Sequence, residues 1–164
     1  MPATHGAPPR DFLKGELTEW FGLHGRMEHA SGAGRSALEG RHAELETRIR
    51  TWPRTVENGP FRASSLELGR LLSEATGLAV LVGFNEFCSP SVEEALEQAV
   101  AQSAARVVVV TAMMTRGGEH ADRDIPAAIG HMRARYPGIR FVYAWPFEDE
   151  DVASFLASRV SREP

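Results

Sequence analysis

Hydrophobic and polar positions change their spacing about halfway along the chain. In the first half, apolar side chains recur three or four positions apart, which predicts amphipathic helices over residues 12–29, 37–49 and 64–76. The run SGAG at 31–34 should break the chain between the first two helices. Two prolines and an Asn-Gly pair make 51–61 irregular, and Gly77 should end the third helix.

The second half alternates short apolar runs with helical patterns. The runs at 78–84, 106–114 and 139–144 predict strands, and the middle one contains four consecutive valines. A strand that is apolar on both faces is typical of a parallel sheet with helices on both faces. The order strand, helix, strand, helix, strand, helix therefore predicts a doubly wound α/β domain.

Capping residues and prolines indicate where the helices of the second half begin. Ser89 can cap a helix whose first position is Pro90, and Asp124 precedes Ile-Pro at the start of the next helix. The second of these helices should end at Tyr-Pro-Gly, residues 136–138. A closing helix is expected over 152–160.

Composition excludes several classes of protein. A net charge of −4 gives no reason to expect nucleic-acid binding, and the 43% of hydrophobic residues argues against global disorder. The single cysteine, Cys88, rules out an intrachain disulfide or a Cys-rich zinc site. No apolar run approaches the ~18 residues of a membrane span, and the first residues lack a signal-peptide core. We therefore expect a cytoplasmic protein with no membrane partner.

Ligands of a parallel sheet bind beyond the carboxyl ends of its strands, so the loops at 83–89, 115–124 and 145–151 are the candidate site. Glu86 lies in the first loop, and His120 follows a Gly117-Gly118 pair in the second. His5 also follows a strand if residues 2–4 are the end of one. Two imidazoles and one carboxylate suit Co²⁺, Fe²⁺, Ni²⁺ or Zn²⁺, and three protein ligands leave an open position for chemistry.

Each candidate also has a plain structural explanation. A lone loop histidine is usually a surface residue, and a glutamate near a helix N-terminus, such as Glu86, can interact with the helix dipole alone. The other histidines, at positions 24, 29, 42 and 131, lie on predicted helices and are expected to be solvated.

At these loops the sequence resembles the sirohydrochlorin chelatases of the CbiX type. The stretch GGEHADRDIP matches the family's Gly-Gly-x-His-x-x-x-Asp-Ile-Pro, and GFNEFCSPSVEEAL matches a strand that ends in Phe-x-Glu before Pro-Ser-x-Glu-Glu-Ala. THGAPPRDF fits the family's His-Gly at the end of its first strand. The resemblance covers residues 78–160 well and implies a chelatase-like, flavodoxin-like parallel sheet.

The resemblance also implies an activity and roles for the site residues. Such enzymes insert Co²⁺ or Fe²⁺, and in some relatives Ni²⁺, into sirohydrochlorin without ATP or an organic cofactor. His120 would be the principal ligand and base, with His5 opposite and Glu86 as a third ligand or proton acceptor. Gly117 and Gly118 would let the backbone approach the substrate. Arginines beside the two histidines would bind the substrate's carboxylates; they are Arg10, Arg116 and Arg123.

The chain departs from the family pattern at its N-terminal side. The strand before His5 is truncated, and about 23–60 reads as a helical and irregular insertion within a single domain spanning 1–164. Small relatives pair, which implies a homodimer. Two alternatives stay open: a non-catalytic protein that binds metal or tetrapyrrole, and an unrelated flavodoxin-like nucleotide binder, for which a phosphate loop is missing.

Overall fold

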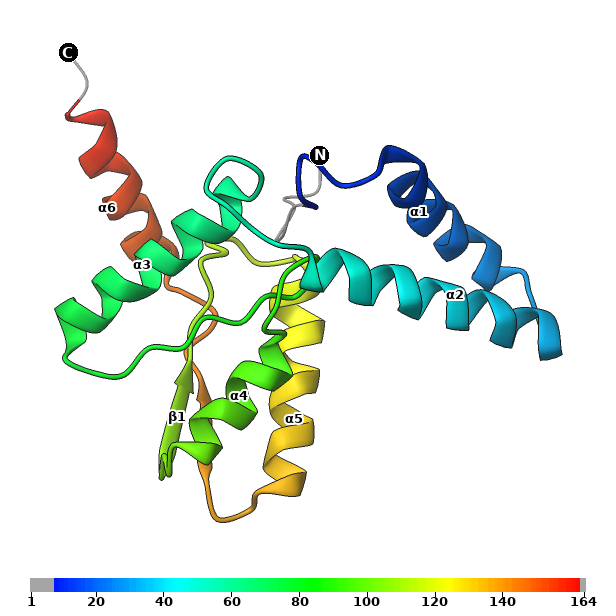
Figure 1. Cartoon of the computed structure of the whole chain (residues 1–164). Coiled ribbons are helices and arrows are strands. Elements are labelled where there is room, and N and C mark those ends of the chain that lie inside the picture. Colours follow the sequence, from blue (N-terminus) through cyan, green and yellow to red (C-terminus); the bar gives the residue numbers. More distant parts are fainter. Residues whose placement is uncertain (1–7, 163–164) are drawn as a thin grey trace. The chain divides into compact units, whose positions relative to one another are not determined.

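The computed structural model describes residues 8–162, and the chain divides into two compact units, Met1–Ala95 and Leu96–Pro164 (Figure 1). Each unit is described by itself. Across the described residues, no helix combines the length and the apolar character that a membrane crossing requires.

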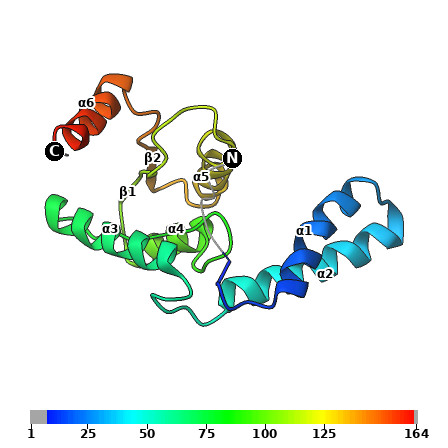
Figure 2. The same ribbon diagram turned by 90° about the horizontal axis from the view of Figure 1, so that it is seen from above.

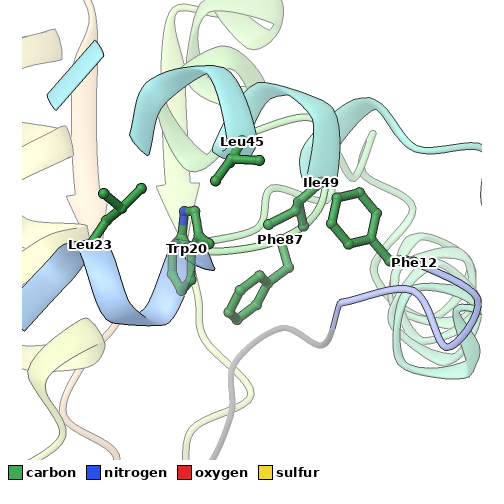
Figure 3. Close-up of a cluster of buried hydrophobic side chains, with 6 residues drawn as sticks. All are labelled: Phe12, Trp20, Leu23, Leu45, Ile49 and Phe87. Carbon is green, nitrogen blue, oxygen red and sulfur yellow. The ribbon is translucent and has the colours of Figure 1, made fainter. Parts of the chain in front are cut away.

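The first unit begins with a helical hairpin. Helices α1 (Lys14–Glu28) and α2 (Gly32–Thr51) lie side by side in both views (Figures 1 and 2). Apolar side chains from the two helices and from two loops meet in a buried cluster (Figure 3), which consists of Phe12, Trp20, Leu23, Leu45, Ile49 and Phe87. The helical spacing of the sequence therefore produces one shared apolar seam.

Ion pairs cross the seam between the two helices. The Arg41 guanidinium donates to both carboxylate oxygens of Glu19, at 2.8 and 2.9 Å, and Arg48 Nη1 donates to Glu16 at 2.5 Å. These side chains keep part of their surface in solvent, so each pair contributes modestly to stability. Their larger effect is to fix the register of α1 against α2.

The predicted break at 31–34 is only partly correct. The turn between the helices ends at Ser31, and α2 already begins at Gly32, whose φ of 56° is the left-handed conformation that glycine adopts at little cost. The rest of the SGAG run is helical, because helix packing outweighs the weak propensity of an isolated glycine.

Helix α3 (Pro60–Thr76) ends where the sequence predicts. Gly77 has φ 68° and its amide donates to the Ser73 carbonyl at 2.8 Å, which is a left-handed C-terminal cap. The helix begins four residues before the predicted start, because proline suits the first position of a helix. Several of its leucines are more than a third exposed: Leu66, Leu68, Leu71 and Leu72.

The apolar run at 78–84 is not a strand, which corrects the predicted sheet. It forms one isolated bridge, in which Phe84 pairs with Ser91 and the Phe84 amide donates to Pro90 at 2.9 Å. A Cβ at Gly69 of α3 would lie 2.5 Å from Val82, so α3 packs closely on this run. The apolar side chains are therefore partly covered by a helix, and within residues 8–162 the run joins no strand of the sheet.

Helix α4 (Val92–Ala101) spans the junction of the two units, and its cap differs from the predicted one. Ser91, rather than Ser89, precedes the helix. Its hydroxyl accepts from the Glu94 amide at 3.1 Å, and the Glu94 carboxylate accepts from the Ser91 amide at 2.5 Å. This reciprocal capping box satisfies two backbone donors, which a start at Pro90 would not achieve.

The second unit contains a parallel two-stranded sheet. Strand β1 (Arg106–Val109) pairs with β2 (Arg140–Tyr143), with Arg106 opposite Arg140 and Val109 opposite Tyr143. Both strands lie inside the predicted runs, so the mixed helix and strand class and the parallel pairing are confirmed. Within the described part of the chain, the sheet has two strands in place of the larger doubly wound sheet that the pattern predicts.

Helices flank this sheet in the sequence order that was expected. Helix α5 (Ile125–Arg135) packs against β2, and its Ile129 and Met132 are 1% exposed. Helix α6 (Asp149–Val160) begins three residues before the predicted start, with three acidic residues in its first turn that favour a helix N-terminus. Burial of β1 on both faces is not observed, because Val108 is 48% exposed.

Candidate functional site

The loop that follows β1 leads into an unusual turn of helix. Residues His120–Asp124 form a π-helix, η1, which runs directly into α5. The Ile125 amide donates to the His120 carbonyl, so the turn holds one more residue than an α-turn. Single π-turns are frequent at functional sites because they re-aim a side chain. Here the turn presents His120 at the start of the helix.

Asp124 orients the His120 ring. His120 Nδ1 lies 2.6 Å from Asp124 Oδ2, four positions further on. With the carboxylate ionised, Nδ1 carries the proton and donates it, which leaves Nε2 deprotonated. This carboxylate–imidazole arrangement is the one that supports metal-bound histidines. The His120 side chain is 19% exposed, so the ring is partly shielded yet reachable from solvent.

Asp122 holds the loop in place through both of its carboxylate oxygens. One accepts from the Gly117 amide at 2.7 Å, and the other accepts from Trp145 Nε1 at 2.9 Å. Gly117 adopts φ 86°, a conformation that a side chain would strain. The predicted Gly117-Gly118 turn is therefore tied to the loop after β2 by one carboxylate.

Three aromatic side chains lie at the end of β2 and in the loop that follows it. The Trp145 ring is stacked on Tyr143 at 6.4 Å and meets Phe147 edge-on at 5.3 Å. The Tyr143 hydroxyl donates to the Ala121 carbonyl at 3.0 Å. Burial, with a smaller effect of Asp122, raises the pKa of Tyr143 to about 12, so this hydroxyl stays protonated at neutral pH.

Glu86 belongs to the first unit, in a tight turn. The Cys88 amide donates to the Glu86 carbonyl at 2.7 Å, and Phe87 between them has φ 58°, which is rare for a bulky residue. The strain is offset because the Phe87 ring is buried in the hairpin cluster, 5.2 Å from Trp20. Packing in the hairpin therefore fixes the backbone on which Glu86 is carried.

Two arginines of the hairpin side also bind this turn. Arg50 donates to the carbonyls of Asn85 and Cys88, at 2.7 and 2.9 Å, and Arg54 donates to the Phe87 carbonyl. Burial lowers the pKa of Arg54 from its ordinary value. Arg50 and Arg54 lie in the predicted insertion at about 23–60, so the insertion holds the turn that carries Glu86.

The remaining predicted site residues lie in different surroundings. Arg116 is exposed. Arg123 is ion-paired with Glu119 and approaches Asp124 at 3.4 Å, so carboxylates of its own turn already occupy its donors. Arg10 belongs to the first unit, where its amide donates to Asn58 at 2.9 Å. His5 lies outside the described residues.

The structure adds three residues that the sequence did not single out as site residues: Asp122, Asp124 and Trp145. The i, i+4 spacing of His120 and Asp124 was a usable signal for one contact, since such residues face each other on a helix. The contacts of Asp122 join loops that are far apart in the sequence. Across residues 8–162, no three His, Cys, Asp or Glu side chains are grouped so that they could hold a metal ion.

A parallel two-stranded sheet, flanked by helices, with a carboxylate-oriented histidine in the segment that follows β1, places the second unit in the α/β class. Within that class, the CbiX family model matches residues 60–163. The chain belongs to the CbiX family. The helical hairpin precedes the matched residues.

Curated relatives match about half of the chain. A sirohydrochlorin ferrochelatase of Priestia megaterium is 33% identical over 81 residues, 49% of this chain and 30% of that protein. A sirohydrochlorin cobaltochelatase of the same organism is 36% identical over 78 residues, 47% of this chain and 25% of that protein. The chain thus spans less than a third of the length of these relatives. A solved structure titled SirB from Bacillus subtilis with Fe³⁺ is similar at 28% identity and a TM-score of 0.47, over 63% of this chain and 43% of that one.

Proposed function

We propose that this protein takes part in inserting a divalent metal, Co²⁺ or Fe²⁺, into sirohydrochlorin. Membership of the CbiX family supports the proposal, and the relatives named above carry out these two insertions according to their names. The observation that carries it is the His120–Asp124 pair, because a histidine whose Nδ1 is held by a carboxylate is prepared to use Nε2 on a metal or a proton.

The chemistry requires a group that binds the ion loosely and then accepts a proton. A divalent ion that enters the macrocycle replaces two pyrrole N–H protons, so two protons must leave. His120 Nε2 holds the ion first and accepts one proton once the ion has moved, since imidazole titrates near neutral pH. The roles of Glu86 and His5 as further ligands or proton acceptors, which the resemblance implies, stay predictions.

The loops beside His120 suit a flat macrocycle that carries carboxylates. The Trp145 and Tyr143 rings offer an apolar face, and Gly117 lets the backbone approach closely. Arg116 and Arg123 flank the same loop, and a substrate carboxylate would take over Arg123 from Glu119. This local positive charge compensates for a chain whose net charge is −4.

Purified protein mixed anaerobically with sirohydrochlorin and Co²⁺ tests the proposal. The absorbance of the free macrocycle should be lost faster than in the same mixture without protein, with saturation in both substrates. A rate equal to the protein-free rate overturns catalysis. If the macrocycle or the metal then still binds, the non-catalytic binding protein that the sequence left open is the correct assignment.

Asn in place of Asp124 should raise the apparent KM for Co²⁺ by about 10- to 100-fold, the usual effect of losing a carboxylate behind a metal-bound histidine. The amide keeps the size of the side chain but no longer stabilises the Nδ1–H tautomer. Steady-state insertion kinetics give the value. Glu119→Gln is the matched control, because Glu119 is an exposed carboxylate directly before the same turn that pairs with Arg123 and not with His120 Nδ1. Equal KM values for the two variants would contradict the orienting role.

Alanine at Trp145 should raise the KM for sirohydrochlorin by about 2- to 13-fold, which corresponds to the 0.5–1.5 kcal/mol of an aromatic contact. Trp145→Phe keeps a ring but loses the hydrogen bond to Asp122. Comparison of the two variants separates stacking from loop positioning. An unchanged KM in both would show that the macrocycle does not use this face.

A further inference from the structure

Two histidines meet in the helical hairpin of the first unit. His24 Nδ1 of α1 lies 3.0 Å from His42 Nε2 of α2, although the residues are 18 positions apart. The rings are 4.8 Å apart and inclined at 69°. His24 is exposed, whereas the His42 side chain is only 13% exposed, which corrects the expectation that both are solvated.

Trp20 holds the two rings in position. Its indole is stacked on His42 at 5.1 Å and lies 5.3 Å from His24. Trp20 is itself 7% exposed and part of the buried cluster (Figure 3), and the Arg41–Glu19 pair fixes α1 against α2. The imidazole pair is therefore built on packed side chains.

The distance between the two nitrogens suits a shared cation. With metal–nitrogen bonds of about 2.1 Å, two ligands at 90° place their nitrogens about 3.0 Å apart, and at a tetrahedral angle about 3.4 Å apart. The 3.0 Å between His24 and His42 falls at the first value. Without metal, the N–H of one ring donates a hydrogen bond to the other ring. A metal would need that proton moved to the distal nitrogen of the same ring, and the two rings turned so that both lone pairs point at the ion.

The Glu46 carboxylate lies beside Nδ1 of His42, the ring nitrogen that does not contact His24. Glu46 Oε2 lies 3.9 Å from His42 Nδ1, and Glu46 Oε1 accepts from Arg50 Nε at 3.0 Å. This distance is an electrostatic approach and not a hydrogen bond. The carboxylate nevertheless favours the tautomer with the proton on Nδ1, which leaves Nε2 deprotonated toward His24. Burial and then the nearby His24 lower the pKa of His42, so the ring is neutral near pH 7, as a metal ligand must be.

We propose that His24 and His42 form a two-imidazole site for a borderline divalent cation such as Ni²⁺, Cu²⁺, Co²⁺ or Zn²⁺, with water completing the coordination shell. The residues come before the region that matches the family model. With only two protein ligands, the ion exchanges readily, so the site loads or holds metal and does not lock it in place. The proposal stands whether or not the protein inserts metal into a macrocycle.

Equilibrium dialysis of the untagged full chain against Co²⁺ and Ni²⁺ tests the site. His24→Ala should weaken one binding equivalent by at least about tenfold, and Glu46→Gln should weaken the same equivalent by about tenfold. His29→Ala is the matched control, because His29 is an exposed histidine at the end of the same helix. His24 is exposed, so its replacement should leave the far-UV circular dichroism of the protein unchanged.

Spectroscopy identifies the ligands independently. Cu²⁺ bound at one equivalent should show two nitrogen ligands by electron paramagnetic resonance, reduced to one in His24→Ala. Identical binding and spectra for the wild type and His24→Ala would overturn the proposal and leave a hydrogen-bonded pair only. His120→Ala should leave this equivalent intact, so loss of the chelatase function and loss of this site are distinguishable.

Discussion

Alanine in place of His120 should lower kcat/KM for metal insertion by about 10²- to 10⁴-fold, the range expected when a positioned general base is lost. His120 is proposed to hold the entering ion and then to accept a pyrrole proton, and Asp124 keeps its ring in the required tautomer at 2.6 Å. Methyl in place of imidazole removes both functions. The measurement is the initial rate of loss of sirohydrochlorin absorbance at saturating and limiting Co²⁺.

His131→Ala is the control for this variant. His131 is an exposed histidine of α5, in the same unit and close in sequence, and it is assigned no role in the reaction. Its replacement should leave the rate within about twofold. Surface substitutions usually change the free energy of unfolding by no more than about 0.5 kcal/mol, so the variant stays folded, and the reaction does not use His131. Wild-type activity in His120→Ala would remove the histidine from the mechanism, and equal losses in both variants would indicate a structural effect.

Replacement of Leu45 by alanine should destabilise the first unit by about 2–5 kcal/mol, the cost of a cavity at a fully buried leucine. Leu45 is 0% exposed and lies in the cluster with Trp20, Leu23 and Ile49 (Figure 3). The packed helices cannot collapse freely around the gap, because ion pairs fix their register.

Urea unfolding followed by tryptophan fluorescence measures this effect. Of the three tryptophans, Trp20 and Trp52 lie in the hairpin cluster or against it, so a Trp145→Phe background reports on the first unit alone. Val56→Ala is the control, because Val56 is 68% exposed and should change the free energy of unfolding by less than about 0.5 kcal/mol. A similar midpoint for the Leu45 and Val56 variants would show that the cluster does not support the unit.

Local sequence signals located most helices correctly. The left-handed Gly77 ends α3, and the Asp-Ile-Pro at 124–126 marks the start of α5, because caps and prolines act within a few residues of themselves. The cap of α4 was misplaced by two residues. Ser89 and Ser91 are equivalent as local signals. Ser91 is the cap because its hydroxyl and its amide both form hydrogen bonds with Glu94 in the first turn.

The sequence indicated which loop holds the candidate site, and the structure adds contacts in that loop that the sequence does not specify. A histidine after a valine-rich strand and a Gly-Gly pair indicates a ligand loop, and residues 60–163 belong to the CbiX family. The Asp122 bridge from Gly117 to Trp145 connects loops that follow different strands, so no local pattern specifies it. The ligand roles of His5, Glu86 and His120 stay predictions, and the experiments above address His120 directly.

The sequence by itself predicted most helices approximately, the runs that contain the two short strands, and the place of His120 in the segment after β1, because periodicity, caps and turn residues act over a few positions. Only the tertiary structure decided that the run at 78–84 packs on α3 through Gly69 and does not pair as a strand, since its apolar pattern suits either outcome. It also decided that His24 meets His42. That contact depends on how α1 lies against α2, which is set by side-chain packing between residues distant in the sequence.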